Sequence, residues 1–254
     1  MPYLNIHGAN LFHEVYGEQG PWLALTSGGR HRYLEMAPLA QAIAAQGFRV
    51  LVHDRRNTGA SDIIIAGDDS EEDIWADDLR ALLQHYGATQ AFLGGSSAGA
   101  RLAMTVYRRH PSFVSGLLLM RVTGGAFAAG RLPNNYYGQY IKAAHAGGMA
   151  AVCDTEPYRE RLALNPASRE RLMAMDPRDY MAVMGRWLTR GVTHVVALAN
   201  FLGADFVFRM NFYHCCHDPH TPPHPGCGGL NLRHMWESLA NFSLFKRAFK
   251  RFEE

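Results

Sequence analysis

The sequence predicts an α/β fold in which a mostly parallel sheet is flanked by helices. Short apolar runs that suit buried strands alternate with segments whose apolar residues recur at helical spacing, and the links between them are short. This alternation indicates βαβ units, because parallel strands need a crossover connection that is usually a helix. A length of 254 residues fits one domain of this class. We therefore expect a single domain over residues 1–254.

The first half of the chain contains the clearest elements. Two alternating segments separated by Gly8 predict an antiparallel hairpin. Ser70 is placed to begin a helix that Gly87 closes, with Asp73 three residues after the serine as an acidic variant of the capping box. Gly47 suits the end of the helix before it. The expected strands are residues 3–6, 10–16, 22–26, 49–53, 91–94 and 114–120, and the expected helices are 33–46, 70–87 and 98–109.

The second half has a different pattern. Residues 124–196 contain no convincing strand, only helix-like pieces broken by Gly-Gly, Asn-Pro and Asp-Pro pairs. A helical insertion of this length after a parallel strand predicts a lid over the strand ends. Strand character returns at residues 206–213, and residues 235–252 form an amphipathic pattern that predicts a last helix.

Composition limits the classes of function. The formal net charge is +2, with no local block of like charge, so no electrostatic footprint for nucleic acid is expected. No apolar run approaches the roughly 18 residues that a membrane span needs, and the first residues lack the pattern of a signal peptide. Four cysteines are too few for a disulfide scaffold. We expect a cytoplasmic protein, and the sequence indicates nothing about its oligomeric state.

The sharpest motif is G-x-S-x-G, formed by Gly95, Ser97 and Gly99 between the expected strand 91–94 and the expected helix 98–109. A serine at a sharp strand-to-helix turn sits in strained backbone, and its neighbours two positions away must be small so that strand and helix can close up. The helix N-terminus then lies beneath the reacting oxygen, where the amide of Ala98 can stabilise negative charge. We therefore predict that Ser97 is a nucleophile.

With this motif the sequence resembles the α/β-hydrolase superfamily over most of its length. Residues 26–30 (TSGGR) stand where the family often has a His-Gly pair, and residues 53–62 (HDRRNTGASD) are similar to the family stretch D-x-R-G-x-G-x-S-D. The resemblance implies that a backbone amide after the third strand, best assigned to Gly29, is the second oxyanion donor. It also implies that Asp54 and Arg55 are structural.

The resemblance further implies the rest of a catalytic triad. Residues 214–222 are similar to the family pattern G-x-x-D-P-x-T-P, which makes Asp218 the acid, with Asp205 a distant second. Residues 228–237 are similar to the family ending in which the histidine follows the last strand, which makes His234 the general base. The resemblance implies no cofactor. Epoxide hydrolases and dehalogenases of the superfamily carry an aspartate at the elbow, so serine at position 97 argues against both.

These assignments predict a serine hydrolase that cleaves a small acyl substrate, an ester or a lactone, by a Ser-His-Asp mechanism. Two alternatives stay open. A C–C bond hydrolase of ring-cleavage products shares the fold and the triad, and would need a cation for the substrate carboxylate, for which the candidates are Arg30, Arg121 and Arg186. Only 15 residues separate Asp218 from His234, where the fold normally fits a helix and a strand, so a catalytically inactive binding protein is the other alternative.

A cluster of histidines and cysteines over residues 214–227 has the chemistry of a zinc site. Matched C-x₂-C pairs are missing, however, and adjacent cysteines rarely share one tetrahedral ion. We therefore predict no metal, and interpret the cluster either as a proline-rich loop beside the active site or as a divergent tail under weak constraint.

Overall fold

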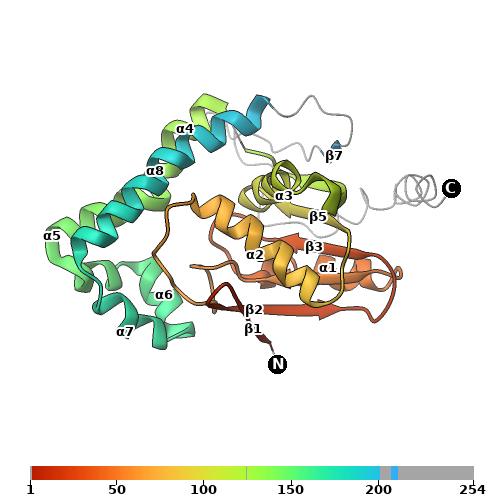
Figure 1. The fold of residues 1–254 in the computed structure, drawn as a ribbon, viewed down its shortest axis with the longest axis horizontal. Coiled ribbons are helices and arrows are strands. Elements are labelled where there is room, and N and C mark those ends of the chain that lie inside the picture. The colour runs from red at the N-terminus through yellow and green to blue at the C-terminus, as the bar shows by residue number, and fades with distance from the viewer. Residues whose placement is uncertain (1, 124, 201–206, 211–254) are drawn as a thin grey trace, which may run out of the picture. The chain divides into compact units, whose positions relative to one another are not determined.

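A seven-stranded sheet organises the part of the chain that the structure, a computed structural model, describes: residues 2–123, 125–200 and 207–210. The strand order is β1-β2-β4-β3-β5-β6-β7 (Figure 1). The strands from β4 to β7 run parallel, while β1 and β2 form an antiparallel hairpin that joins the edge of β4. The strands are β1 (Tyr3–Ile6), β2 (Ala9–Tyr16), β3 (Trp22–Thr26), β4 (Arg49–His53), β5 (Ala91–Ser96), β6 (Val114–Met120) and β7 (Val207–Met210). The mostly parallel sheet that the sequence predicts is thus confirmed.

The strands match their predicted positions closely: β2 begins one residue earlier than predicted, and the larger difference is at the end of β5. The prediction ended this strand at Gly94, but β5 continues to Ser96, which pairs with Met120 of β6. The two added residues, Gly95 and Ser96, have no apolar side chain to signal a strand. They are held by a parallel neighbour, which a single segment of sequence does not show.

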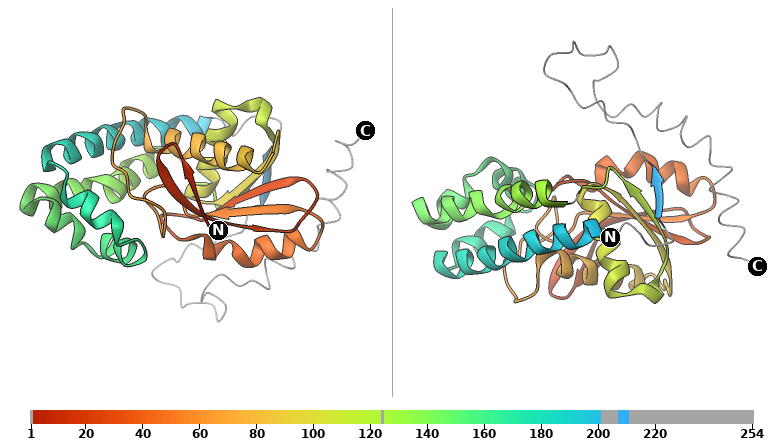
Figure 2. Two further views of the ribbon diagram at one scale, coloured as in Figure 1. Left: turned by 60° about the horizontal axis from the view of Figure 1, so that its bottom comes forward. Right: turned by 90° about the horizontal axis from the view of Figure 1, so that it is seen from above.

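Three helices cover the two faces of the sheet: α1 (Ala37–Ala44), α2 (Glu71–His85) and α3 (Ala98–Arg109). α1 lies on one face, and α2 and α3 lie together on the other (Figure 2). The expected helix 33–46 is instead a 3₁₀ turn at Tyr33–Glu35 followed by α1. Pro38 in the first turn explains the break, since its fixed φ and missing N–H suit a helix start.

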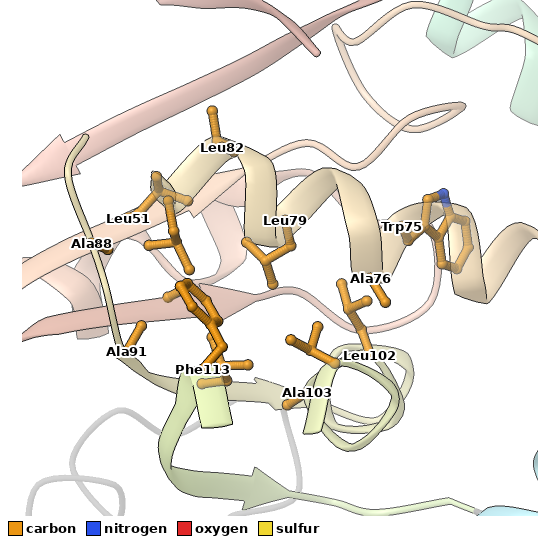
Figure 3. Packing of buried hydrophobic residues seen from close by; sticks show 14 of the residues in the cluster. Leu51, Trp75, Ala76, Leu79, Leu82, Ala88, Ala91, Leu102, Ala103 and Phe113 are labelled. Carbon is orange, nitrogen blue, oxygen red and sulfur yellow. The ribbon is translucent and has the colours of Figure 1, made fainter. Parts of the chain in front are cut away.

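The main core lies between the sheet and the pair α2–α3. Fully buried leucines from α2, α3 and β4 meet there, and Figure 3 shows Leu79, Leu102 and Leu51 gathered in it. Ser70 caps α2 as predicted, because its hydroxyl accepts a hydrogen bond from the amide of Asp73 at 3.1 Å. This packing fixes the start of α2 near the end of β5, where α3 also begins.

In the part of the chain that the structure describes, five helices follow β6, with a π-helical turn at Asn134–Gly138. They bury an aromatic core of their own, which includes Tyr137, Tyr158, Tyr180 and Trp187. None of the helices in the described ranges is long and apolar enough to cross a membrane. The helices are α4 (Gly125–Pro133), α5 (Gln139–Cys153), α6 (Glu156–Leu164), α7 (Ala167–Met173) and α8 (Pro177–Asn200).

Hydrogen bonds join these helices to the segment between β4 and α2. The Arg161 guanidinium donates to the carbonyl of Asn57 at 2.9 Å, and the indole of Trp187 donates to the carbonyl of Asp69 at 3.0 Å. The amide of Ile63 in turn donates to the hydroxyl of Ser168 at 3.1 Å. That residues 124–196 serve as a lid, within a single domain over residues 1–254, stays a prediction.

Candidate active site

The candidate site lies where the chain reverses the direction in which it builds the sheet. From β3 the chain adds β4 on one side, and then returns to add β5 on the other side of β3. The carboxyl ends of β3 and β5 therefore border a topological switch point, which is where ligands bind in open α/β sheets. Residues 27–30 follow β3 there, and Ser97 follows β5.

Ser97 has the backbone of a strained elbow. Its φ is 53° and its ψ is −107°, a left-handed conformation that costs a non-glycine residue free energy. The turn is held because the Ser97 amide donates to the carbonyl of Met120 at 2.9 Å, and α3 starts at the next residue. The sequence therefore locates this feature correctly.

The two glycines of the motif are required by contact. A Cβ on Gly95 would lie 2.5 Å from the carbonyl oxygen of Thr26 and 2.6 Å from the carbonyl carbon of Gly99. A Cβ on Gly99 would lie 2.1 Å from the same Thr26 oxygen. Strand β3, the elbow and α3 thus touch through backbone alone, which brings residues 27–29 close to Ser97.

Among the described residues, the Ser97 hydroxyl forms one side-chain hydrogen bond, with the hydroxyl of Thr123 at 3.4 Å. The Arg101 guanidinium donates to the same Thr123 oxygen at 2.7 Å. Because Thr123 accepts from Arg101, its own hydrogen is free to be donated to Ser97. This arrangement leaves the proton of Ser97 for a general base.

The expected oxyanion donors occupy suitable places. Ala98 is the first residue of α3, so its amide has no partner inside the helix. Gly29 lies in the loop after β3 with φ of 44°, and its carbonyl accepts from the guanidinium of buried Arg55. Arg55 therefore holds the loop by the carbonyl of Gly29, while the neighbouring amide of Gly28 is taken by the carboxylate of Glu35 at 2.9 Å.

Asp54 ties the same loop to the segment after β4. One of its carboxylate oxygens accepts from the amide of Tyr33 at 2.7 Å and the other accepts from the amide of Ala60 at 2.8 Å. The group is fully buried, and this burial raises the pKa of Asp54. Gly59, with φ of 55°, packs directly on the carboxylate. Asp54 and Arg55 thus both bind backbone groups of the loops around the site.

Arg30 and Glu71 form a bidentate ion pair at the inner side of the site, with N···O distances of 3.1 and 2.6 Å. Glu71 is 1% exposed and also accepts from Asn57 at 2.8 Å and from the Tyr137 hydroxyl at 2.9 Å. Four segments meet at this one carboxylate: the loop after β3, the loop after β4, the start of α2, and the turn before α5.

This network changes the interpretation of the three arginines considered for a substrate carboxylate. Arg30 is committed to Glu71. Arg186 donates to the carbonyl of Gly67 and lies 3.6 Å from Asp68, and Arg121 is exposed. The sequence alone does not show which arginines form ion pairs with carboxylates, because the partners lie far away in the chain.

Sequence reasoning missed Arg101, which is 2% exposed and lies one turn along α3 from Ser97. It also missed Glu72, which is 5% exposed on α2. Within the described part of the chain, the Nε of Arg101 and one carboxylate oxygen of Glu72 are buried without a hydrogen-bond partner. The spacing of four residues between Ser97 and Arg101, on one face of a helix, is the signal that could have indicated Arg101.

A histidine near the site was missed as well. Glu35, whose carboxylate binds the amide of Gly28, lies 3.5 Å from the Nδ1 of His31. A Cβ on Gly28 would be 3.6 Å from the Cβ of Ser97 and 3.8 Å from Glu35, so this His-Glu pair borders the same loop as the nucleophile. The His31 side chain is 71% exposed.

The remaining site residues of the sequence prediction, Asp218 and His234, lie outside the described residues, as do Asp205 and the cluster at 214–227. Of strand 206–213, residues 207–210 form β7 beside β6, and helix 235–252 is outside the described ranges. The triad Ser97–Asp218–His234 therefore stays a prediction.

We expect Glu72→Gln to stabilise the protein at alkaline pH. Burial, and next the charge of Glu71, raise the pKa of Glu72 from 4.5 to about 7, against the opposing charges of Arg101 and Arg30. The folded state therefore holds this proton more tightly than the unfolded state, and the wild type loses stability as pH rises between these two values, by about 3 kcal/mol in total. Glutamine does not ionise and avoids that loss.

The measurement is the thermal midpoint of both proteins from pH 5 to pH 8. The advantage of Glu72→Gln should be small at pH 5 and grow to roughly 5–10 °C at pH 8. A constant difference between the two proteins over this range would contradict the shifted pKa of Glu72.

Comparison with known proteins agrees with this geometry. Residues 23–145 match the family model of the alpha/beta hydrolase fold. Among solved structures, a hydrolase from Pseudomonas aeruginosa PA01 is 21% identical with a TM-score of 0.50, covering 73% of this chain and 71% of that chain. A variant of the Vigna radiata epoxide hydrolase is 14% identical with a TM-score of 0.51, covering 80% and 76%. The enol-lactonase from Burkholderia xenovorans LB400 is 21% identical with a TM-score of 0.49, covering 74% and 73%.

At these identities the first two structures, with TM-scores of 0.50 and 0.51, show similarity of fold alone, and this fold agrees with the family match. The strand order, the serine elbow at the switch point and the match over residues 23–145 together show that the chain has the α/β-hydrolase fold.

Proposed function

We propose that this protein hydrolyses a small acyl substrate, an ester or a lactone, with Ser97 as the nucleophile. The observation that carries the proposal is the strained backbone of Ser97, at the switch point of the sheet and at the start of α3. Strain of this kind persists only where the surrounding structure enforces it, and it concentrates at functional sites. Gly95 and Gly99 permit the close backbone packing that enforces it here, because backbone atoms fill the space that their side chains would need.

The proposed reaction has two steps. The Ser97 oxygen attacks the acyl carbon, and its proton passes to His234, which Asp218 orients; the carbonyl oxygen becomes an oxyanion and accepts from the amides of Ala98 and Gly29. The bond to the leaving oxygen breaks, and His234 returns the proton to the departing alcohol. Water then attacks the acyl-enzyme by the same route and releases the acid and free Ser97.

Each oxyanion donor of this type typically contributes a factor of about 10²–10³ to the rate. Gly29 thus matters although it has no side chain, and Arg55 matters because it holds the Gly29 carbonyl. The proposal needs no cofactor. The helices after β6 would cover the substrate as a lid.

Fluorophosphonate labelling followed by intact mass measurement tests the proposal. The wild type should gain one adduct and Ser97→Ala should gain none, because only an activated serine reacts. Ser96→Ala is the matched control, since Ser96 is the adjacent serine and lies buried in β5; this variant should still be labelled. A folded wild type that gains no adduct would overturn the proposal, and would leave a catalytically inactive binding protein as the better account.

The general base is assigned by two further variants. We expect His234→Ala to lose labelling and His31→Ala to keep it, because His31 is largely exposed. The opposite pattern would move the role of base to His31, with Glu35 as the acid that orients it.

A further inference from the structure

We propose that Arg101, with Arg55 beside it, forms a subsite next to Ser97 that binds a carboxylate carried by the substrate. The inference deepens the proposed function and rests on it: the acyl substrate would be a monoester or lactone of a dicarboxylic acid. It concerns a different pair of arginine side chains from those that the sequence pointed to.

Arg101 has the position that such a subsite requires. Its guanidinium binds the Thr123 hydroxyl at 2.7 Å, and that hydroxyl is 3.4 Å from the Ser97 oxygen. The side chain is 98% buried, and its Nε hydrogen has no acceptor among the residues that the structure describes. A buried guanidinium with an unused donor is costly unless an acceptor completes it.

Arg55 supplies the second donor. One of its terminal nitrogens holds the carbonyl of Gly29, while the other, Nη1, is buried without a partner in the described part of the chain. Its guanidinium carbon lies 4.7 Å from the centre of the Trp75 ring, which fixes its orientation. Arg55 and Arg101 are close enough for the charge of Arg101 to lower the pKa of Arg55.

Within the described part of the chain, neither of these two arginines has an ion-pair partner of its own. Glu71 is already paired with Arg30. The carboxylate of Asp54 is close enough to Arg55 for their charges to interact, but it accepts from the amides of Tyr33 and Ala60. The charge of Arg101 acts on Glu72, whose pKa of about 7 keeps it partly protonated at neutral pH. The pKa of Arg55 falls to about 10 through burial, so this group still carries its charge at pH 7. An anionic group on the substrate would give the two guanidinium groups an ion-pair partner.

The geometry of a guanidinium suits both carboxylates and phosphates. We favour a carboxylate because two guanidinium nitrogens are unpartnered, Nε of Arg101 and Nη1 of Arg55, and a carboxylate offers one oxygen to each. A phosphonate analogue in the test distinguishes the two anions.

The experiment compares three 4-nitrophenyl esters of similar length: the hemiglutarate, the uncharged valerate and the 4-phosphonobutyrate. For the wild type we expect kcat/KM to be at least about 10-fold higher for the hemiglutarate than for the valerate, since hydrogen bonds between charged groups are the strong ones. Arg101→Met should remove most of this preference, mainly through KM for the hemiglutarate. Arg101→Lys, which keeps the charge, should restore part of it.

Two controls separate the subsite from other effects. Arg178→Met removes the same charge from an arginine whose side chain is 86% exposed, and should keep the wild-type preference. Thr123→Val removes the hydroxyl that binds the Arg101 guanidinium, and it should reduce the preference for the hemiglutarate less than Arg101→Met does. This variant tests the subsite if Arg101→Met does not fold. Equal kcat/KM for the hemiglutarate and the valerate in the wild type would overturn the inference, while hydrolysis itself still stands. A higher kcat/KM for the 4-phosphonobutyrate than for the hemiglutarate would show that the subsite binds a phosphate group and not a carboxylate.

A binding measurement keeps the inference testable if no ester is turned over. Ser97→Ala should bind glutarate by titration calorimetry, and the double variant Ser97→Ala/Arg101→Met should bind it at least about 10-fold more weakly. Binding of glutarate, together with no ester hydrolysis by the wild type, would overturn the proposed function and support the subsite. If glutarate does not bind, the subsite is overturned.

Discussion

Gly99→Ala is expected to destabilise the protein by at least about 3 kcal/mol and to abolish labelling of Ser97. The new Cβ would lie 2.1 Å from the carbonyl oxygen of Thr26, 2.7 Å from its carbonyl carbon and 3.0 Å from the carbonyl oxygen of Ser27. All three are backbone atoms at the end of β3, a central strand paired on both sides. No side chain can rotate away to relieve the overlap, so either α3 or the loop that carries Gly29 must move.

Chemical denaturation and fluorophosphonate labelling measure the two effects. Gly185→Ala is the matched control: Gly185 lies inside α8, and a Cβ there meets nothing within 4 Å. This control should gain about 0.5–1 kcal/mol, because alanine is the better helix former. Gly99→Ala with wild-type stability and labelling would show that the elbow does not have the described close contact.

Glu71→Ala is expected to cost about 3–5 kcal/mol of stability, the range found when one partner of a buried ion pair is removed. The substitution leaves Arg30 largely buried without its bidentate acceptor, and it removes the acceptor of Asn57 and Tyr137 as well. Because these donors tie three separate segments to the start of α2, we expect the turn at Asn134–Gly138 to become accessible to hydrogen exchange at the same time.

A double variant separates the charge from the contacts. Arg30→Met/Glu71→Leu removes both charges and should be clearly more stable than Glu71→Ala, since no unpaired charge is left. Arg178→Ala breaks an ion pair with Asp176 that is exposed to solvent, and should leave the thermal midpoint unchanged. If Glu71→Ala is as stable as Arg178→Ala, the network around Glu71 does not hold these segments together.

Local patterns predicted most of the fold. The hairpin, the strands of the sheet and the cap of α2 at Ser70 depend on residues near one another in the chain, so periodicity, glycine positions and a capping hydroxyl sufficed to place them. Ser97 was found for the same reason, because the elbow is a five-residue motif between two recognisable elements. Pro38 shows a limit of periodicity: apolar spacing continued across residues 33–46, but the chain begins its helix only at Ala37.

By itself, then, the sequence determined the parallel α/β architecture, the strained serine and the glycines that permit it. Only the tertiary structure decided which charged residues are paired. The sequence does not distinguish Arg30, Arg55 and Arg101 from one another. The fold pairs Arg30 with Glu71, Arg55 with the Gly29 carbonyl and Arg101 with Thr123. The physical reason is that the electrostatic state of a buried group depends on partners far away in the chain and on how much water the fold excludes. Periodicity and motif spacing carry neither quantity.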